Sequence, residues 1–148
     1  MVGFLCTHRP RSVNSKRKGT EKFKEAIRES FKYYYSDTNL LDDELYGIAY
    51  YFHKKKTEID ADNLSKPIWD ALETLLYKDD KIIKLRYTGI YDIKNDVRKL
   101  NITKMPTNVF RDFLNLIDNN QIEHLIYIEL GKLNNSLYII GGETHEII

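Results

Sequence analysis

The thirteen residues from Asp60 to Leu72, with the sequence DADNLSKPIWDAL, decide the fold because they lead from a buried strand into an amphipathic helix. Pro67 removes a backbone hydrogen bond and clashes with the preceding turn when it lies deep inside a helix. We therefore predict a helix that begins near residues 63–65 and continues to about residue 77. Its apolar residues recur at helical spacing and should pack on a sheet: Leu64, Ile68, Ala71, Leu72, Leu75.

The segments around this helix predict the other elements of the fold. Residues 2–6 form a short apolar run and residues 45–53 are dense in Tyr, Ile and Phe, so both are predicted strands. Residues 81–92 and 97–104 predict a hairpin whose turn lies at 92–96. A second amphipathic helix is predicted at residues 20–35. The expected fold is α+β, with a mixed sheet packed against two main helices.

The length of 148 residues suits one domain. We assign residues 1–106 to that domain and residues 107–148 to a C-terminal extension packed on it, with a helix at 107–117 and a hairpin from segments 125–130 and 137–140. The single cysteine, Cys6, excludes an internal disulfide, and no segment has the pattern of a signal peptide or a membrane span. We therefore expect a cytoplasmic protein.

The net charge of +1 says little, but its distribution is uneven. Residues 1–36 carry nine Lys or Arg and three Glu, a balance of +6, whereas the remainder carries a balance of −5. The basic loop after the first strand is thus a candidate site for phosphate. The alternative for such a cluster is an ordinary solvated N-terminus.

Carboxylates concentrate in the segment that opens the helix and in the pair Asp79 and Asp80 beyond its end. Hard cations such as Mg²⁺ prefer oxygen ligands, which Asp60 and Asp62 provide. Asp80 joins them only if the chain turns back along the helix, which rises about 20 Å over 14 residues. Three alternatives stay open: a helix cap at residues 60–63, a surface ion pair of Lys66, and an ordinary polar turn at residues 79–80.

The order of these residues resembles the signature of RusA-type Holliday junction resolvases. That signature contains Asp-x-Asp-Asn at residues 60–63, a lysine at Lys66, Asp-Ala-Leu at residues 70–72 and a double Asp at residues 79–80. A weaker resemblance lies at residues 10–14, where the sequence is Pro-Arg-Ser-Val-Asn. The resemblance covers residues 1–104, with Pro67 as a departure, and it does not extend to residues 107–148.

The resemblance implies a Mg²⁺-dependent DNA endonuclease, with Mn²⁺ as a substitute metal. Asp60, Asp62 and Asp80 are the implied metal ligands, Lys66 the implied catalytic cation, and Asn63 and Asp79 the implied supporting residues. The family forms homodimers that make paired nicks in a four-way junction, so the implied partners are branched DNA and a second copy of the chain. The implied DNA contacts come from the basic loop: Arg9, Arg11, Asn14, Lys16, Arg17, Lys18.

Three other functions compete with this one. An inactive binder of branched DNA with the same fold would be expected to have lost part of the acidic set, which is intact. A metal-dependent nucleotide-sugar transferase would use Asp60 and Asp62, but the chain is short for two substrate sites and lacks a glycine-rich phosphate loop. A purely structural dimerisation module has no evident use for an exposed acidic cluster.

Overall fold

A four-stranded mixed sheet organises the computed structural model, which describes residues 1–12, 14, 16–96 and 99–138. The strands are β1 (Val2–Cys6), β2 (Leu45–His53), β3 (Ile83–Asp92) and β4 (His124–Lys132), in the spatial order β1-β4-β2-β3. β4 is antiparallel to both β1 and β2, whereas β2 and β3 are parallel. This confirms the expected α+β fold with a mixed sheet.

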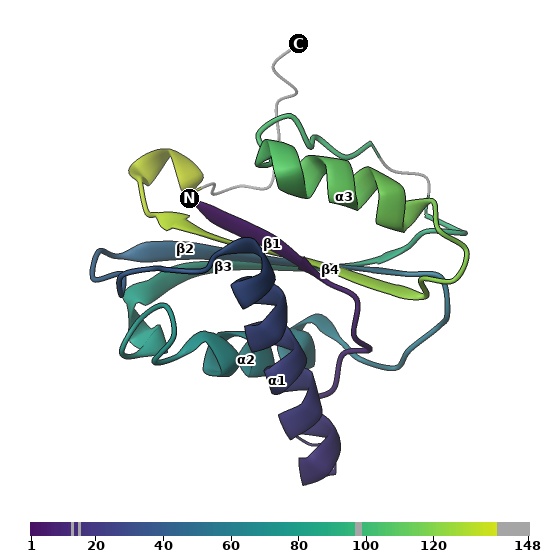
Figure 1. The fold of residues 1–148 in the computed structure, drawn as a ribbon, viewed down its shortest axis with the longest axis horizontal. Coiled ribbons are helices and arrows are strands. Elements are labelled where there is room, and N and C mark those ends of the chain that lie inside the picture. The colour runs from purple at the N-terminus through teal and green to yellow at the C-terminus, as the bar shows by residue number, and fades with distance from the viewer. Residues whose placement is uncertain (13, 15, 97–98, 139–148) are drawn as a thin grey trace.

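Helices cover both faces of the sheet (Figure 1). α1 (Arg17–Tyr34) and α2 (Ala61–Leu72) lie on one face, and α3 (Thr107–Ile117) lies on the other. Two short 3₁₀ helices, Asp80–Ile82 and Asn135–Leu137, precede β3 and follow β4. The predictions for residues 2–6, 45–53 and 107–117 agree with β1, β2 and α3, and α1 begins three residues before the predicted start at residue 20.

The main core lies between the sheet and the two helices α1 and α2. Leu64, Ile68 and Leu72 are fully buried there together with Ala49 and Tyr51 of β2, which confirms that α2 packs on the sheet. A smaller core on the opposite face joins α3 to the sheet through six buried side chains: Leu5, Phe52, Val109, Phe113, Leu125, Tyr127.

The predicted strand at residues 97–104 was wrong. The described residues 99–104 contain no strand, and residues 97–98 lie outside the described part of the chain. The fourth strand is β4, where residues 125–128 are four consecutive buried residues, as suits an inner strand with both faces covered. Residues 99–104 instead carry Lys99, Asn101 and Lys104, all exposed. Residues 107–132 thus complete the same sheet as the N-terminal part of the chain.

The predicted C-terminal hairpin also differs from the structure. Its first segment lies within β4, but Leu137 belongs to the second 3₁₀ helix, and residues 139–140 lie outside the described residues. Asn134 begins that 3₁₀ helix because its side chain accepts a hydrogen bond from the backbone N–H of Ser136 at 2.9 Å. The described chain after β4 therefore forms a 3₁₀ turn, whose Leu137 carbonyl accepts from the hydroxyl of Tyr87 in β3, and not a second hairpin strand.

Both predicted ends of α2 were wrong. The helix begins at Ala61 because the carboxylate of Asp60 accepts a hydrogen bond from the backbone N–H of Asn63 at 2.8 Å. Pro67 lies inside the helix, where its ring is buried with its neighbours and this burial offsets the lost hydrogen bond. The helix ends at Leu72, because Thr74 takes a positive φ of 66° and donates to the carbonyl of Tyr77 at 2.6 Å.

Gly47 provides a test of how tightly α2 packs on β2. A Cβ atom at this position would lie 2.8 and 2.9 Å from two carbon atoms of the Trp69 ring. Trp69 is fully buried and its indole N–H donates to Ser65 at 2.9 Å, so the ring cannot move aside easily. We expect Gly47→Ala to destabilise the protein by about 1–3 kcal/mol in denaturant unfolding.

Gly19 in the first turns of α1 is the matched control. The nearest atom to a Cβ there is 3.9 Å away, and alanine is favoured over glycine in a helix by about 0.5–1 kcal/mol. Gly19→Ala should therefore leave stability unchanged or raise it. Equal unfolding midpoints for Gly47→Ala and the unsubstituted protein would contradict the close packing of Trp69 on β2.

Candidate metal and phosphate site

The carboxyl ends of β1, β2 and β3 lie at one edge of the sheet. This follows from the pairing, because β1 and β2 are both antiparallel to β4 and β3 is parallel to β2. The basic loop follows β1 at this edge, and the segment 54–60 that leads into α2 follows β2. Ligands commonly bind at the carboxyl ends of strands, and here that edge combines acidic and basic side chains.

The N-terminus of α2 carries the first acidic pair. Asp60 is exposed, and its two carboxylate oxygens accept from the backbone N–H of Asn63 at 2.8 Å and from its side-chain amide at 3.1 Å. The helix-cap alternative therefore holds for Asp60. Asp62 lies in the first helical turn, is exposed, and has no hydrogen-bond or ion-pair partner among the described residues. Of the predicted site carboxylates, Asp62 is thus the one most available to a cation.

A polar cleft of about 270 Å³ separates the basic loop from the start of α2. Its walls include Arg9, Arg11 and Ser12 on one side and Thr57, Glu58 and Asn63 on the other. The loop is tied to α1, because the Thr20 hydroxyl donates to the carbonyl of Ser12 at 2.7 Å. Asn63 therefore links the cleft to Asp60, and a phosphate group in the cleft would lie close to the α2 N-terminus.

The predicted DNA-contacting side chains remain available for solvent or ligand. Where the structure describes them, none of the five cations forms an ion pair with a carboxylate, and Asn14 is exposed. The cations are also exposed: Arg9, Arg11, Lys16, Arg17, Lys18. Residues 13 and 15 of the same loop lie outside the described residues.

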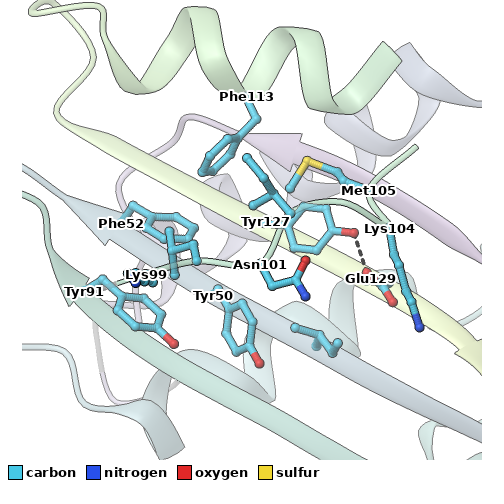
Figure 2. A pocket seen from close by; sticks show the side chains of 13 residues that line it. Tyr50, Phe52, Tyr91, Lys99, Asn101, Lys104, Met105, Phe113, Tyr127 and Glu129 are labelled. Carbon is cyan, nitrogen blue, oxygen red and sulfur yellow. Dashed lines mark hydrogen bonds between the residues drawn. The ribbon is translucent and has the colours of Figure 1, made fainter. Parts of the chain in front are cut away.

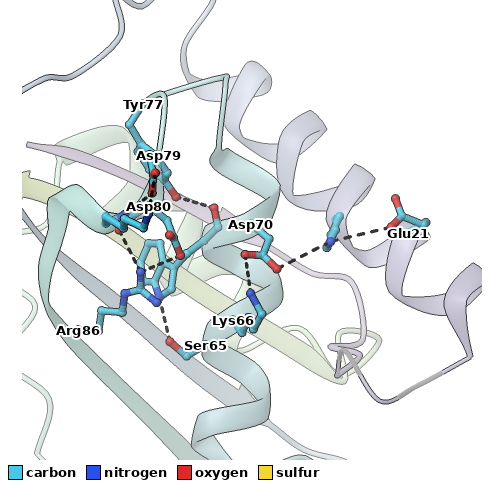
Figure 3. Close-up of polar contacts among 11 residues, drawn as sticks. Glu21, Ser65, Lys66, Asp70, Tyr77, Asp79, Asp80 and Arg86 are labelled. Carbon is cyan, nitrogen blue, oxygen red and sulfur yellow. Dashed lines mark hydrogen bonds and ion pairs between the residues drawn. The ribbon is translucent and has the colours of Figure 1, made fainter.

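Lys66 faces α1 and takes part in an ion pair (Figure 3). Its ammonium lies 3.1 Å from a carboxylate oxygen of Asp70, whose other oxygen is 4.0 Å from Lys24 of α1. The Lys66 side chain is 60% exposed, so the pair contributes only a few tenths of a kcal/mol. The ion-pair alternative left open by the sequence is therefore present, and it leaves Lys66 easy to reorient.

Asp79 and Asp80 take different partners on the β3 side of α2. Asp79 accepts from the backbone N–H of Lys81 at 2.9 Å and so begins the 3₁₀ helix. Asp80 accepts from the guanidinium of Arg86 through its carboxylate at 2.9 Å and its carbonyl at 3.1 Å. Figure 3 shows Asp80 and Arg86 on the side of α2 away from α1, whereas Lys66 and Asp70 lie on the side that faces α1.

The expected grouping of Asp60, Asp62 and Asp80 around one ion is not present among the described residues, where no three acidic, His or Cys side chains gather closely enough to hold a metal. The chain does turn back after α2, as that grouping required. The returning strand β3, however, brings Arg86 to Asp80, and an arginine–carboxylate pair is a favourable alternative for an isolated carboxylate. Asp60 is meanwhile engaged by Asn63.

Sequence reasoning missed Arg86, in the first half of β3, and a histidine pair at the edge where β2 ends. His53 and His124 are paired in register across β2 and β4, and the Tyr51 hydroxyl lies 2.7 Å from Nδ1 of His124. Burial lowers the pKa of His124, which keeps its imidazole neutral near pH 7. No local sequence signal reveals this pair, because the two histidines lie on strands that are distant in the chain.

The fold and site together define a class of protein: an α+β domain that presents exposed carboxylates next to a basic cleft, as suits binding of a phosphate backbone. A family model described as Endodeoxyribonuclease RusA matches residues 6–103. The chain therefore belongs to the RusA family, whose members are DNA endonucleases that act on Holliday junctions. The match contains the whole acidic segment and ends before α3 and β4.

No curated protein matches the chain. No helix in the described residues has both the length and the apolar character needed to cross a membrane.

Two substitutions of Asp60 separate the contribution of the helix cap from that of the negative charge. Asp60→Ala removes the acceptor for the Asn63 N–H and should lower the free energy of unfolding by about 1 kcal/mol. Asp60→Asn keeps a side-chain oxygen that can cap the helix, so its stability should stay within a few tenths of a kcal/mol of the unsubstituted protein. Denaturant unfolding measures both variants, and equal stability of Asp60→Ala and the unsubstituted protein would contradict the cap.

Proposed function

We propose that the protein is a divalent-metal-dependent endodeoxyribonuclease that resolves Holliday junctions and other branched DNA by paired nicks. The main support is the RusA family match, which contains every residue from Asp60 to Asp80. The exposed Asp62 and the cleft between Arg9, Arg11 and Asn63 support it independently, because a nuclease needs anionic ligands beside a phosphate site.

In this proposal Asp60, Asp62 and Asp80 would hold Mg²⁺, with Mn²⁺ as a substitute. Carboxylate oxygens are the donors these cations prefer, and Asp60 and Asp62 are both exposed. When bound, such a cation lowers the pKa of a water molecule and offsets charge on the leaving oxygen. Asp80 would have to exchange Arg86 for this role, and Arg86 would then be free to contact phosphate.

The other residues of the segment would position and neutralise the substrate. Lys66 lies one helical turn after Asp62, and its weak surface pair with Asp70 lets its ammonium move to a phosphate at little cost. There it would offset the extra negative charge of the transition state. Asn63 would hold Asp60 in place, and Asp79 would order the turn before Asp80.

The basic loop would bind the DNA backbone. Arg9 and Arg11 line the cleft, and the cations at residues 16–18 extend the basic surface to the start of α1. Contacts to phosphate set affinity and salt dependence without reading sequence, which suits an enzyme that recognises the shape of a junction. Asn14 would add a neutral hydrogen bond to the same backbone.

Two symmetric nicks require two active sites, so we propose that a homodimer carries out the reaction. Such an enzyme would serve DNA recombination and repair in the cytoplasm. The alternative of a branched-DNA binder without cleavage shares the fold and the basic loop, and it differs only at the carboxylates. The experiments that separate the two must therefore change the acidic set while leaving DNA binding intact.

Asp62→Asn makes this separation. The substitution preserves the size of the side chain and leaves the Asp60 cap untouched, so stability should change little. It removes an anionic ligand, and cleavage of a synthetic four-way junction in Mg²⁺ should fall by at least about 100-fold. Junction binding without metal should persist or tighten, because one negative charge beside the phosphate is lost.

Asp37→Asn is the matched control, because Asp37 is exposed in the loop after α1 and far along the chain from the acidic segment. It should cut at the unsubstituted rate. A folded Asp62→Asn protein that also cuts at that rate would remove the basis of the proposed metal site. Junction binding without any cutting by the unsubstituted protein, in either metal, would instead favour the inactive binder.

The basic loop is tested by its effect on salt dependence. Replacing its five cations by Gln should weaken binding to duplex DNA and reduce the slope of log affinity against log salt by up to about 4.5, since each phosphate contact contributes about 0.9. An equal loss of charge elsewhere should change the slope far less. The control variant replaces five other exposed cations: Lys22, Lys78, Lys84, Lys94, Arg111. Equal slopes for the two variants would mean that the loop is only a solvated segment.

A further inference from the structure

The face of the sheet that carries α3 has a cavity of about 430 Å³ that the proposed chemistry does not use. Its floor is formed by side chains of β2 and β3, and the segment after β3 forms one wall (Figure 2). The volume falls within the range of sites that bind small organic groups. The cavity lies on the opposite face of the sheet from α1 and α2, so it is separate from the core that supports the metal site.

Aromatic rings dominate the floor of the cavity. Phe52 and Tyr91 are stacked with ring centres 5.2 Å apart, and Tyr50 meets Tyr91 edge to face at 5.8 Å. Phe113 of α3 packs on Phe52 at 5.3 Å and fixes that ring from the other side. These contacts hold the rings in place, so the floor offers preformed flat surfaces rather than flexible side chains.

The rim of the cavity offers hydrogen-bond donors and positive charge. The side-chain oxygen of Asn101 is engaged by the backbone N–H and hydroxyl of Thr103, which leaves its amide nitrogen to donate outward. Lys99 and Lys104 are exposed and, within the described residues, have no carboxylate partner. The rim is therefore suited to a ligand with acceptor atoms and negative charge.

The carboxylate of Glu129, which also lines the cavity, does not cancel the positive charge of the rim. Glu129 accepts hydrogen bonds from the hydroxyls of Tyr46, at 2.6 Å, and Tyr127. Burial, together with this carboxylate, raises the pKa of both tyrosines, so they remain neutral donors to Glu129 at any physiological pH. The charge of Glu129 is thus held by two internal hydrogen bonds on the β4 side of the cavity.

We propose that this cavity binds an unpaired base of a DNA substrate, with the base stacked on Tyr50 and the adjoining phosphate held by Lys104. Bases have flat faces for stacking and acceptor atoms along their edges, which matches the aromatic floor and the donor rim. A base next to a branch point is less costly to unstack than one inside a duplex. The inference rests on the proposed function, because it takes branched DNA as the substrate.

The experiment compares two DNA probes in EDTA: a perfect duplex, and the same duplex with a flap of five unpaired thymidines. Stacking of one base on an aromatic side chain contributes about 1–3 kcal/mol. Tyr50→Leu should therefore weaken binding of the flap probe by about 5- to 150-fold. Binding of the perfect duplex, which uses the basic loop, should be unchanged.

Tyr33→Leu is the matched control, since Tyr33 is 78% exposed on α1 and does not line the cavity. A second variant, Lys104→Gln, changes only an exposed side chain, so it tests the cavity even if Tyr50→Leu proves unstable in thermal unfolding. Its binding to the flap should lose about 0.7 from the slope of log affinity against log salt, as one single-strand phosphate contact predicts.

Three results would overturn the inference. The first is unchanged flap binding by Lys104→Gln together with a folded Tyr50→Leu protein that binds the flap normally. The second is an equal loss of duplex and flap binding by Tyr50→Leu. The third is a change from dimer to monomer in light scattering for Tyr50→Leu, which would mean that the cavity region forms the contact between two copies of the chain. Failure of the unsubstituted protein to bind or cut a four-way junction would instead contradict the proposed function itself.

Discussion

The pairing of β4 with two strands at once is the constraint on which the rest of the structure depends. Ile128 lies opposite both Phe4 of β1 and Ala49 of β2, so the register of β4 with one neighbour also determines how the other two strands lie relative to each other. A shift of one residue would turn the side chains of β4 to the opposite faces of the sheet. Because β4 runs against both strands, β1 and β2 must point the same way. The basic loop after β1 and the acidic segment after β2 therefore meet at one edge.

The position of α2 then divides the acidic residues between two sides of one helix. Lys66 and Asp70 face α1, where Lys24 continues the alternation of charge, and Arg86 holds Asp80 on the β3 side. Of the predicted site carboxylates, only Asp62 has no partner among the described residues. Asp60 caps α2, and Asp70, Asp79 and Asp80 form separate exposed or half-exposed ion pairs. Such pairs contribute little to stability, so exchanging one of them for a cation and a phosphate costs the fold little.

Local pattern was enough to predict the elements with strong periodicity, such as β2, α3 and the buried face of α2. Prediction from local pattern failed where contacts between residues distant in the chain determine the structure. The inner strand β4 lies more than seventy residues after β2, and no spacing rule shows that residues 124–132, rather than 97–104, join the sheet. The end of α2 depends on the positive φ of Thr74 and its bond to Tyr77, and Pro67 is tolerated because its ring is buried. Asp80 was expected near Asp62, but its partner Arg86 is placed by the pairing of β3 with β2.

Alternation along β2 connects the two faces of the sheet without a hinge. Tyr51 and His53 point to the helical core and the carboxyl edge, whereas Tyr50 and Phe52 point to the cavity beside α3. β2 also leads through residues 54–60 to Asp60 and α2. The aromatic floor of the cavity and the start of the acidic helix are therefore both positioned by β2. The distances between side chains on a strand vary much less than those between side chains on a loop. In the proposed complex, DNA that contacts the acidic segment and the cavity would reach both the carboxyl ends of the strands and the face that carries α3, which suits a branched substrate.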